Sequence, residues 1–416
     1  MPTVTIGVVA RERFSAAGEA LQSIYDHTAQ PFNLVIVDCA IPPAYRRQMD
    51  QVLAGRDNVT VVRVGRYLLP NQSRNLVLKN GTADFICLIE NDIVVRPGWL
   101  ERLIAACDEH PADAAAPLIL ERLGEFEKVH FDDRLGRLEE VATGTGTALR
   151  ILPQEEPKEG TRGGTRREVD FLETHCVLFR SSVFGRVAGF DESITAQEEV
   201  DMSLSLRRAG LTLIVEPASV VTFLPPPPVY PDEKAYYCMK WNPETYAADY
   251  TRVARKWNLI DPPSAMGVVR TRRSYALEPD PAAQLQRQLT SRRKVQATAD
   301  EIARLVPSDR AFILVHDGQL NLGDVAPERH ALPFLERDGQ DWGPPQDSAT
   351  AIDELERMRR EGVGLIVVAW PSFWWLDYYS EFAAYLRAHY PCVLDNERLV
   401  AFALRDERAA ARDTPP

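Results

Sequence analysis

The feature that most constrains the fold is the stretch from Phe85 to Val95, an apolar run with acids near its end. Phe85 to Ile89 is too short for a convincing helix and follows the polar segment 81–84, which predicts a buried central strand of a parallel sheet. Glu90 and Asp92 then stand at the carboxyl end of this strand, where open α/β sheets bind ligands. Carboxylates there suit a hard divalent cation that carries phosphate oxygens. The alternative is a polar turn that only ends the strand.

Segments on either side of this strand alternate between strand and helix patterns, which is typical of an α/β fold. We expect strands at 3–10, 32–38, 59–64, 114–120 and 169–179 and helices at 15–27, 44–53 and 98–107. Asp38 ends the second strand, so it either faces a ligand or caps the helix that begins near Pro43. Arg74 lies in a helix start before the acidic strand. Its guanidinium offers a fixed fork of donors to a diphosphate or a base, although an exposed helix arginine is the commoner case.

Acidic residues crowd the start of another predicted helix, at Glu198, Glu199 and Asp201, and Gly210 supplies a stop for that helix. The N-terminal amides of a helix favour negative charge. Crowded carboxylates disfavour one another's ionisation, so one of them is expected to have a raised pKa and to serve as a base. The alternative is that these acids serve only the helix dipole.

Motif segments that follow one another in the chain resemble those of the family 2 glycosyltransferases, enzymes of the GT-A fold. They are Arg74-Asn75, then Glu90-Asn91-Asp92 with Pro97-Gly98-Trp99-Leu100, then Val187-Ala188-Gly189-Phe190-Asp191-Glu192, and then the stretch from Gln197 to Gly210. The resemblance covers roughly residues 3–258. It implies transfer of a sugar from a nucleoside diphosphate donor to a glycan or another hydroxyl acceptor, with inversion at the sugar.

The same resemblance implies a role for each candidate site residue. Asp38 and Arg74 would contact the nucleotide, and Glu90 and Asp92 would lie at the ribose, the diphosphate and a divalent cation, Mn²⁺ or Mg²⁺. Glu199 occupies the position of the family's catalytic aspartate, so it is expected to take the acceptor proton.

Departures from the family pattern affect the cation most. The family commonly has aspartate where Glu90 and Glu199 stand, and many members have a metal-binding histidine where this chain has Thr222. Because a hydroxyl is a poor substitute for that histidine, Asp92 would be the protein's metal ligand, and the cation is expected to be weakly held or dispensable.

Composition excludes some classes of partner. The formal charge of −12 argues against a general nucleic-acid binder, which needs a basic surface. The N-terminal residues show no signal-peptide pattern, and no segment approaches a membrane span. Six cysteines are scattered without paired spacing, which indicates reduced thiols and a cytoplasmic location.

The remaining segments are less regular. Residues 121–170 are rich in glycine and charge and predict a mobile loop that closes over the donor. Tyr236, Tyr237, Trp241 and Tyr246 either border an acceptor groove or pack in a core. A basic stretch at 261–299 predicts a helical linker, whose basic side chains are either solvated or in contact with an anionic membrane or a protein partner.

The sequence therefore predicts an α/β protein: a GT-A domain with a mixed, mostly parallel sheet at residues 1–260, a helical linker at 261–299 and a smaller accessory α/β domain at 300–416. Aromatic residues between 370 and 375 of the accessory domain suit either a surface for a glycan or a partner or burial against the first domain. Rival hypotheses are a retaining glycosyltransferase and a non-catalytic sugar-nucleotide sensor or scaffold.

Overall fold

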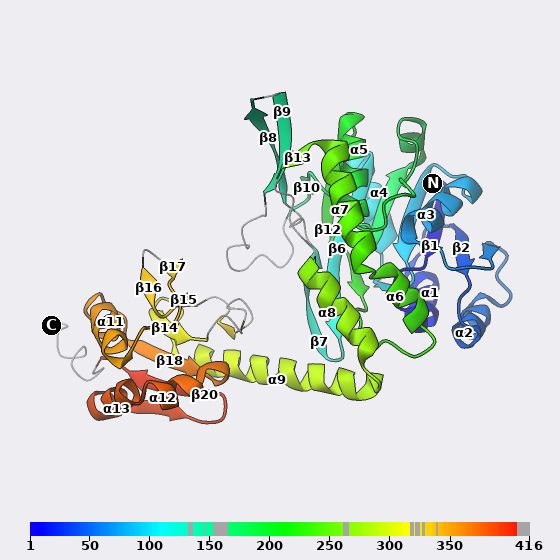
Figure 1. Cartoon of the computed structure of the whole chain (residues 1–416). Helices are drawn as coiled ribbons and strands as arrows, with labels where there is room; N and C mark the ends of the chain where they lie inside the picture. The colour runs from blue at the N-terminus through cyan, green and yellow to red at the C-terminus, as the bar shows by residue number, and fades with distance from the viewer. Residues whose placement is uncertain are drawn as a thin grey trace, which may run out of the picture. The chain divides into compact units, whose positions relative to one another are not determined.

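The computed structural model describes residues 1–131, 136–144, 146–152, 165–260, 266–316, 320, 325–326, 329–337 and 340–405. The chain separates into two compact units, Met1–Gln286 and Arg287–Pro416, so that the division falls inside one long helix, α9 (Pro281–Leu305). Figure 1 shows both units and the helix labels used below. The sequence-based boundaries at 260 and 299 remain predictions about which segments fold independently.

The first unit contains most of the strands and helices. In chain order they are β1 (Val4–Val9), η1 (Phe14–Ala16), α1 (Ala17–His27), β2 (Asn33–Cys39), α2 (Pro43–Leu53), β3 (Val59–Val64), α3 (Pro70–Asn80), β4 (Phe85–Glu90), β5 (Ile93–Val95), α4 (Trp99–Glu109), β6 (Ala114–Leu123), β7 (Phe126–Phe131), β8 (Arg137–Thr143), β9 (Gly146–Leu152), β10 (Arg167–Glu168), β11 (Cys176–Arg180), η2 (Ser181–Gly185), α5 (Glu198–Arg208), β12 (Leu213–Phe223), α6 (Lys234–Lys240), α7 (Pro243–Trp257), β13 (Leu259–Ile260) and α8 (Met266–Leu277).

One mixed sheet organises this unit, with strand order β10-β12-β6-β11-β4-β1-β2-β3. β4, β1, β2 and β3 are parallel neighbours, β11 runs antiparallel between β4 and β6, and β6 and β12 are again parallel. Six of these eight strands, all except β10 and β11, therefore run in one direction. The predicted α/β class and mixed, mostly parallel sheet are confirmed. The parallel strand β4 ends at Glu90, as predicted from the apolar run.

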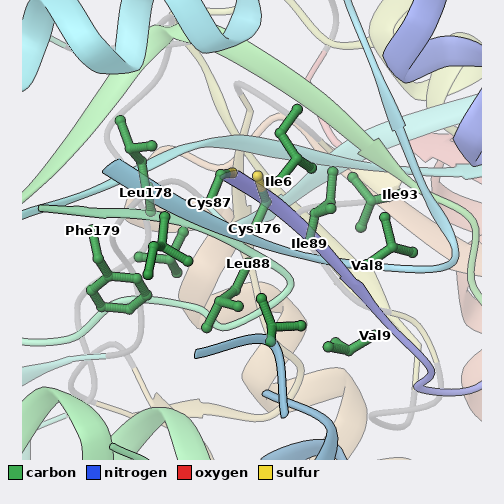
Figure 2. Close-up of a cluster of buried hydrophobic side chains, with 14 of the residues drawn as sticks. Ile6, Val8, Val9, Cys87, Leu88, Ile89, Ile93, Cys176, Leu178 and Phe179 are labelled. Carbon is green, nitrogen blue, oxygen red and sulfur yellow. The ribbon is translucent and has the colours of Figure 1, made fainter. Parts of the chain in front are cut away.

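The core of this unit lies around β1, β4 and β11, whose side chains are buried on both faces of the sheet. Figure 2 shows side chains from these strands packed together, among them Ile6, Leu88 and Leu178. Cys87 and Cys176 lie in this same cluster, and the described cysteines are all free thiols. Burial on both faces explains why β4 reads as a continuous apolar run rather than an alternating one.

Gly7 of β1 sets how closely α3 approaches the sheet. A Cβ built at Gly7 would lie 2.2 Å from Cγ1 of Val77, which is fully buried on α3. Glycine is therefore required where the helix meets the strand. This close packing brings the first turns of α3, including Arg74, against the carboxyl end of β4.

The second unit is a smaller α/β module with a five-stranded sheet of order β15-β14-β18-β20-β19. Its described elements are β14 (Ala311–Val315), β15 (His330–Leu332), β16 (Glu336–Arg337), β17 (Gln340–Asp341), α11 (Ser348–Arg360), β18 (Leu365–Ala369), η3 (Trp370–Ser372), α12 (Trp374–Tyr378), α13 (Ser380–His389), β19 (Cys392–Asp395) and β20 (Leu399–Ala403). This confirms the accessory α/β module. Trp375 is buried in the module's own core, whereas Trp374 is exposed.

The predicted strand at 169–179 is wrong over its first part, because only Cys176–Arg180 form a strand. The N–H of Leu172 donates to the hydroxyl of Ser203, and the N–H of Thr174 donates to the carboxylate of Glu173. Side chains thus take the backbone donors that a neighbouring strand would otherwise use. The segment leaves the sheet and places Glu173 and His175 at its edge.

The predicted mobile loop at 121–170 is also wrong in its described parts. β7 pairs with β6, and β8 pairs with β9 in a hairpin that ends at Thr143 and Gly146. Gly146 has φ of 137°, a conformation that favours glycine. Residues 132–135, 145 and 153–164 lie outside the described residues, so the expectation of a lid over the donor remains a prediction.

The predicted linker contains helices α8 and α9, although residues 261–265 lie outside the described part. The arginines of α8 are not all solvated. Nη1 of Arg272 lies 3.6 Å from Oε2 of Glu12, and the guanidinium lies over the ring of Trp241 at 5.5 Å. α8 therefore belongs to the first unit. Among the described residues, no helix is long and apolar enough to cross a membrane.

Candidate functional site

The ends of β1 and β4 are tied together where the chain leaves the sheet. The N–H of Arg11 donates to Oδ1 of Asn91 over 2.8 Å, and Nδ2 of Asn91 donates to the carbonyl of Arg13 over 2.7 Å. Asn91, the middle residue of the acidic segment, thus fixes the turn rather than facing a ligand. Asn91 therefore ties the ends of β1 and β4 together between Glu90 and Asp92.

Glu90 lies in a buried ion-pair network. Its Oε1 is 2.6 Å from Nη2 of Arg74 and 3.0 Å from Nη1 of Arg11. Nη1 of Arg11 also lies 3.1 Å from Oε1 of Glu198, which in turn is 3.3 Å from Nζ of Lys240. The predicted exposed alternative for Arg74 is wrong, since this side chain is fully buried. The network joins strand ends β1 and β4 to helices α3, α5 and α6.

Asp92 differs from Glu90 because its carboxylate forms no ion pair or hydrogen bond with the described residues. The residue is fully buried, and neither Oδ1 nor Oδ2 accepts a hydrogen bond from the described residues. Burial, together with the charges of Glu90 and Glu12, raises its pKa to about 8. A buried carboxylate without donors costs several kcal/mol if it is ionised, so a bound cation would stabilise the ionised form. The oxygen donors of Asp92 fit a hard divalent ion.

Thr222 cannot take the place of a metal-binding histidine in this arrangement. Its hydroxyl oxygen accepts hydrogen bonds from Nε and Nη2 of Arg96, at 3.3 and 3.2 Å. Arg96 also pairs with Glu127 of β7. The positive charge of the Arg96 guanidinium at this hydroxyl disfavours binding of a metal ion there. Asp92 would therefore have to hold the cation without help from β12.

The three acids at the start of α5 have separate surroundings. Glu198 belongs to the ion-pair network, and Asp201 accepts from Nε1 of Trp257 at 2.7 Å and lies 2.8 Å from Nζ of Lys256. Glu199 is half-buried and, within the described ranges, forms no ion pair. Burial and the neighbouring charges of Glu198 and Glu173 raise its pKa to about 8. Of the three, Glu199 is the carboxyl that remains available to accept a proton.

Asp38 is engaged by its own neighbours. Its Oδ2 lies 2.8 Å from Nε of Arg46 on α2, and its Oδ1 accepts from Nη2 of Arg46 and from the N–H of Ile41, both at 3.1 Å. The helix begins beyond this turn, with Pro42 at its N-cap, so Asp38 does not cap it. Among the described residues, no ion pair or hydrogen bond links Asp38 to the network around Glu90. Its expected contact with a nucleoside remains a prediction.

Aromatic residues of α6 and α7 pack in the core. Tyr236, Tyr237, Trp241 and Tyr246 are all buried, and the rings of Trp241 and Tyr246 stack at 5.2 Å between centroids. The hydroxyl of Tyr236 donates to the carbonyl of Ala10 at the end of β1. The core interpretation of these residues is confirmed. Through Tyr236 they contact the end of β1 beside the site.

A histidine cluster lies beside Glu90 that the sequence did not predict. Nδ1 of His175 is 2.6 Å from Oε1 of Glu173, and Nε2 of His175 is 3.7 Å from Oε2 of Glu90. The rings of His175 and His130 lie 5.1 Å apart, and both contact the ring of Phe223. The charges of Glu90 and Glu173 outweigh the effect of burial and raise the pKa of His175.

The sequence missed Lys240 and Glu12 as well as His130. Lys240 is fully buried, and its Nζ donates to the carbonyl of Thr195 over 2.9 Å. Glu12 is buried between Arg11 and Arg272. The Arg11-Glu12-Arg13 triplet directly after the first strand was the available signal, because charges at a strand's carboxyl end in an α/β sheet often face a ligand.

Comparison with known proteins identifies sequence relatives of the first unit. Residues 5–187 match Glycosyl transferase family 2. This confirms the resemblance for those residues, whereas the acidic start of α5 lies beyond the match. This match does not extend into the second unit. The pre-mycofactocin glycosyltransferase of Mycobacterium tuberculosis (strain ATCC 25618 / H37Rv) is 29% identical over 158 residues, which are 36% of this chain and 29% of that protein.

A further relative, the uncharacterized protein y4gI of Sinorhizobium fredii, is 22% identical over 52% of this chain and 24% of that protein. The matches thus span less than a third of these relatives' lengths. Among solved structures, GalNAc-T7 with UDP, GalNAc and Mn²⁺ is similar with a TM-score of 0.42 and 15% identity over 62% of this chain and 55% of that one. TarS of S. aureus with UDP-GlcNAc has a TM-score of 0.41 and 14% identity over 74% and 82% of the two chains. At these scores the structural likeness adds nothing to the sequence match.

Proposed function

Because residues 5–187 match Glycosyl transferase family 2, we propose that this chain transfers a sugar from a nucleoside diphosphate sugar to a hydroxyl acceptor, with inversion. The observation that carries the proposal is the pair of carboxyls with perturbed pKa values at one end of the sheet. Within the described parts of the chain, the buried Asp92 carboxylate accepts no hydrogen bond and the half-buried Glu199 forms no ion pair. Perturbed carboxyls at a strand end are characteristic of functional sites.

Glu199 is the proposed base. As the acceptor hydroxyl attacks the anomeric carbon, its proton passes to the Glu199 carboxylate and the new C–O bond forms. The bond from that carbon to the phosphate oxygen breaks, and its electron pair leaves with the nucleoside diphosphate. Attack from the face opposite the leaving group inverts the configuration.

Asp92 is the residue that would hold a divalent cation, Mn²⁺ or Mg²⁺. Such a cation supplies positive charge to the phosphate oxygens of the leaving group. Glu90 is proposed to face the ribose, and Arg74 contributes by fixing Glu90. Since Arg74 is fully buried and bonded to Glu90 and Asn71, its proposed contact with the nucleotide is indirect. Asp38 is proposed to meet the base through rearrangement of its pair with Arg46.

A second candidate function is binding of a sugar nucleotide without turnover. The hydrogen bonds from Arg96 to Thr222 favour it, because they remove one expected metal position. Partners of such a sensor, or an anionic membrane, would meet the exposed surface of α9 or of the second unit. Under both hypotheses we propose a cytoplasmic location.

The experiment that tests the proposal is release of nucleoside diphosphate from a panel of sugar nucleotides, with Mn²⁺, with Mg²⁺ and with chelator. We expect one donor to release its nucleoside diphosphate slowly by hydrolysis without acceptor and rapidly by sugar transfer with its acceptor. Asp92→Asn should reduce this release, while Asp50→Asn, the same change on exposed α2, should leave it unchanged. Donor binding without release under every metal condition would favour the sensor, and retained configuration in the product would contradict inversion.

A further inference from the structure

Two histidines and a glutamate converge beside the end of β4 from distant parts of the chain. His130 comes from β7, whereas Glu173 and His175 come from the segment that enters β11. Each offers one ligand atom, and these atoms lie within 4.8 Å of one another. Two imidazoles and a carboxylate are a donor set for a first-row transition metal such as Zn²⁺, Mn²⁺ or Co²⁺.

The surroundings of the two imidazoles match those of metal-binding histidines. Nδ1 of His130 lies 3.3 Å from Oε2 of Glu121, and Nε2 of His175 lies 3.7 Å from Oε2 of Glu90. A histidine that binds a metal through one nitrogen usually directs its other nitrogen to a carboxylate, which fixes the ring and its tautomer. Each ring therefore has one nitrogen near a carboxylate outside the three-residue cluster, while Nδ1 of His175 lies against Glu173 within it.

The spacing within the cluster is close to what a metal requires. Ligand atoms about 2.1 Å from a common ion are about 3.0–3.4 Å from each other. The 2.6 Å between Nδ1 of His175 and Oε1 of Glu173 would open by about half an ångström as an ion replaces the shared proton. The ligand atoms lie within 4.8 Å of one another, so a separation near that limit would close by about 1.5 Å when the ion binds.

A second observation points to a cation at this end of the sheet. Oε2 of Glu90 is buried and accepts no hydrogen bond from the described residues, and neither oxygen of Asp92 does. Both carboxylates lie near His175. Oε2 of Glu90 is 3.7 Å from Nε2 of His175, and Asp92 is close enough that the charge of the imidazolium lowers the pKa of Asp92. Buried carboxylate oxygens without donors are rare unless an ion or water satisfies them.

We propose that His130, Glu173 and His175 form a transition-metal site on β7 and the β11 entry, distinct from the cation that Asp92 would hold. Three protein ligands leave open coordination positions, which suits an exchangeable or catalytic metal rather than a closed structural one. The site differs from the expected family position, Thr222, whose hydroxyl is bound by Arg96. Binding of the metal by these three residues does not require sugar transfer.

The test is metal binding by the full chain, stripped with chelator and free of any tag, using Co²⁺ and Zn²⁺ alone. Equilibrium dialysis should give one tightly bound Zn²⁺ equivalent that is lost or weakened at least tenfold in His130→Gln and in Glu173→Gln. Co²⁺ should give visible absorption bands that the same variants abolish. His110→Gln, at the exposed C-cap of α4, is the matched control and should bind as the original chain does.

Folding is monitored separately, because His175 is buried and its variants risk misfolding, whereas His130 is half-exposed. A His130→Gln chain with unchanged circular dichroism and lost Zn²⁺ supports the site. No bound Zn²⁺ or Co²⁺ in the original chain, or binding that His130→Gln and Glu173→Gln leave unchanged, would overturn it. Asp92→Asn should retain this metal. An original chain that binds Zn²⁺ at these three residues but releases no nucleoside diphosphate from any donor refutes the proposed transferase and not the site.

Discussion

Nη2 of Arg74 lies 2.6 Å from Oε1 of Glu90, and both side chains are fully buried. Arg74 comes from α3 and Glu90 from the end of β4, so the pair fixes the helix against the acidic strand end. Removing one partner of a buried ion pair leaves the other charge without compensation. The pair is therefore a structural support of the proposed donor site.

We expect Arg74→Met to lower the free energy of unfolding by about 3 kcal/mol or more, because Glu90 loses its shortest ion pair and keeps only Arg11 and the more distant His175. Urea denaturation measures the change. Arg46→Met, which removes the pair with Asp38 at a position where the arginine is partly exposed, should cost only about 1 kcal/mol. Equal costs for the two variants would contradict the importance of the buried pair.

Gly7→Ala is expected to destabilise the chain by about 1–3 kcal/mol, since its Cβ would collide with Val77. Gly18→Ala on α1 is the control. A Cβ there meets Cβ of Gln48 at 3.4 Å, and alanine favours the helix by about 1 kcal/mol. Thermal unfolding should shift down for Gly7→Ala and stay level or rise for Gly18→Ala. A stable Gly7→Ala chain would show that α3 moves freely relative to β1.

The pH dependence of turnover should follow Glu199. Burial, with the charges of Glu198 and Glu173, raises its pKa to about 8 in the free protein. A carboxyl is protonated below its pKa and cannot take the acceptor proton, so kcat/KM should rise as pH increases through about 8 and then level off. A profile measured from about pH 6 to about pH 9.5 that stays flat would exclude Glu199 as the group that titrates.

Acid stability should depend on Asp191 in the V-A-G-F-D-E segment. Burial raises the pKa of this carboxyl, but hydrogen bonds from Ser193 and Lys256 outweigh it and lower the pKa to about 2. The ionised form therefore stabilises the folded chain above the ordinary carboxyl pKa, and this contribution is lost as pH falls toward 2. Asp191→Asn should be less stable than the original chain at pH 6 and equally stable near pH 2, as urea midpoints at the two pH values would show.

Much of the first unit follows from local sequence patterns. The apolar run at β4 predicted both the buried strand and the position of Glu90 at its end, because a strand buried on both faces needs apolar residues throughout. The crowded acids at the start of α5 likewise predicted a raised carboxyl pKa at that helix end.

The buried network was not predictable, because its members are far apart in sequence. Arg11, Glu198 and Lys240 meet only after three separate elements fold together. His130 was missed for a different reason: the glycine and charge content around it indicated a loop, whereas pairing with β6 makes its segment a strand. Local composition does not report such tertiary pairing.

The central claim is that Glu199 is the base of a sugar transfer. The most direct measurement compares the turnover of the preferred sugar nucleotide by the original chain, by Glu199→Gln and by Glu244→Gln, the same change on exposed α7, together with donor affinity for each. We predict that Glu199→Gln lowers kcat by at least a hundredfold, consistent with loss of a general base, while donor affinity and the Glu244→Gln rate stay unchanged. Full turnover by Glu199→Gln would contradict the assignment.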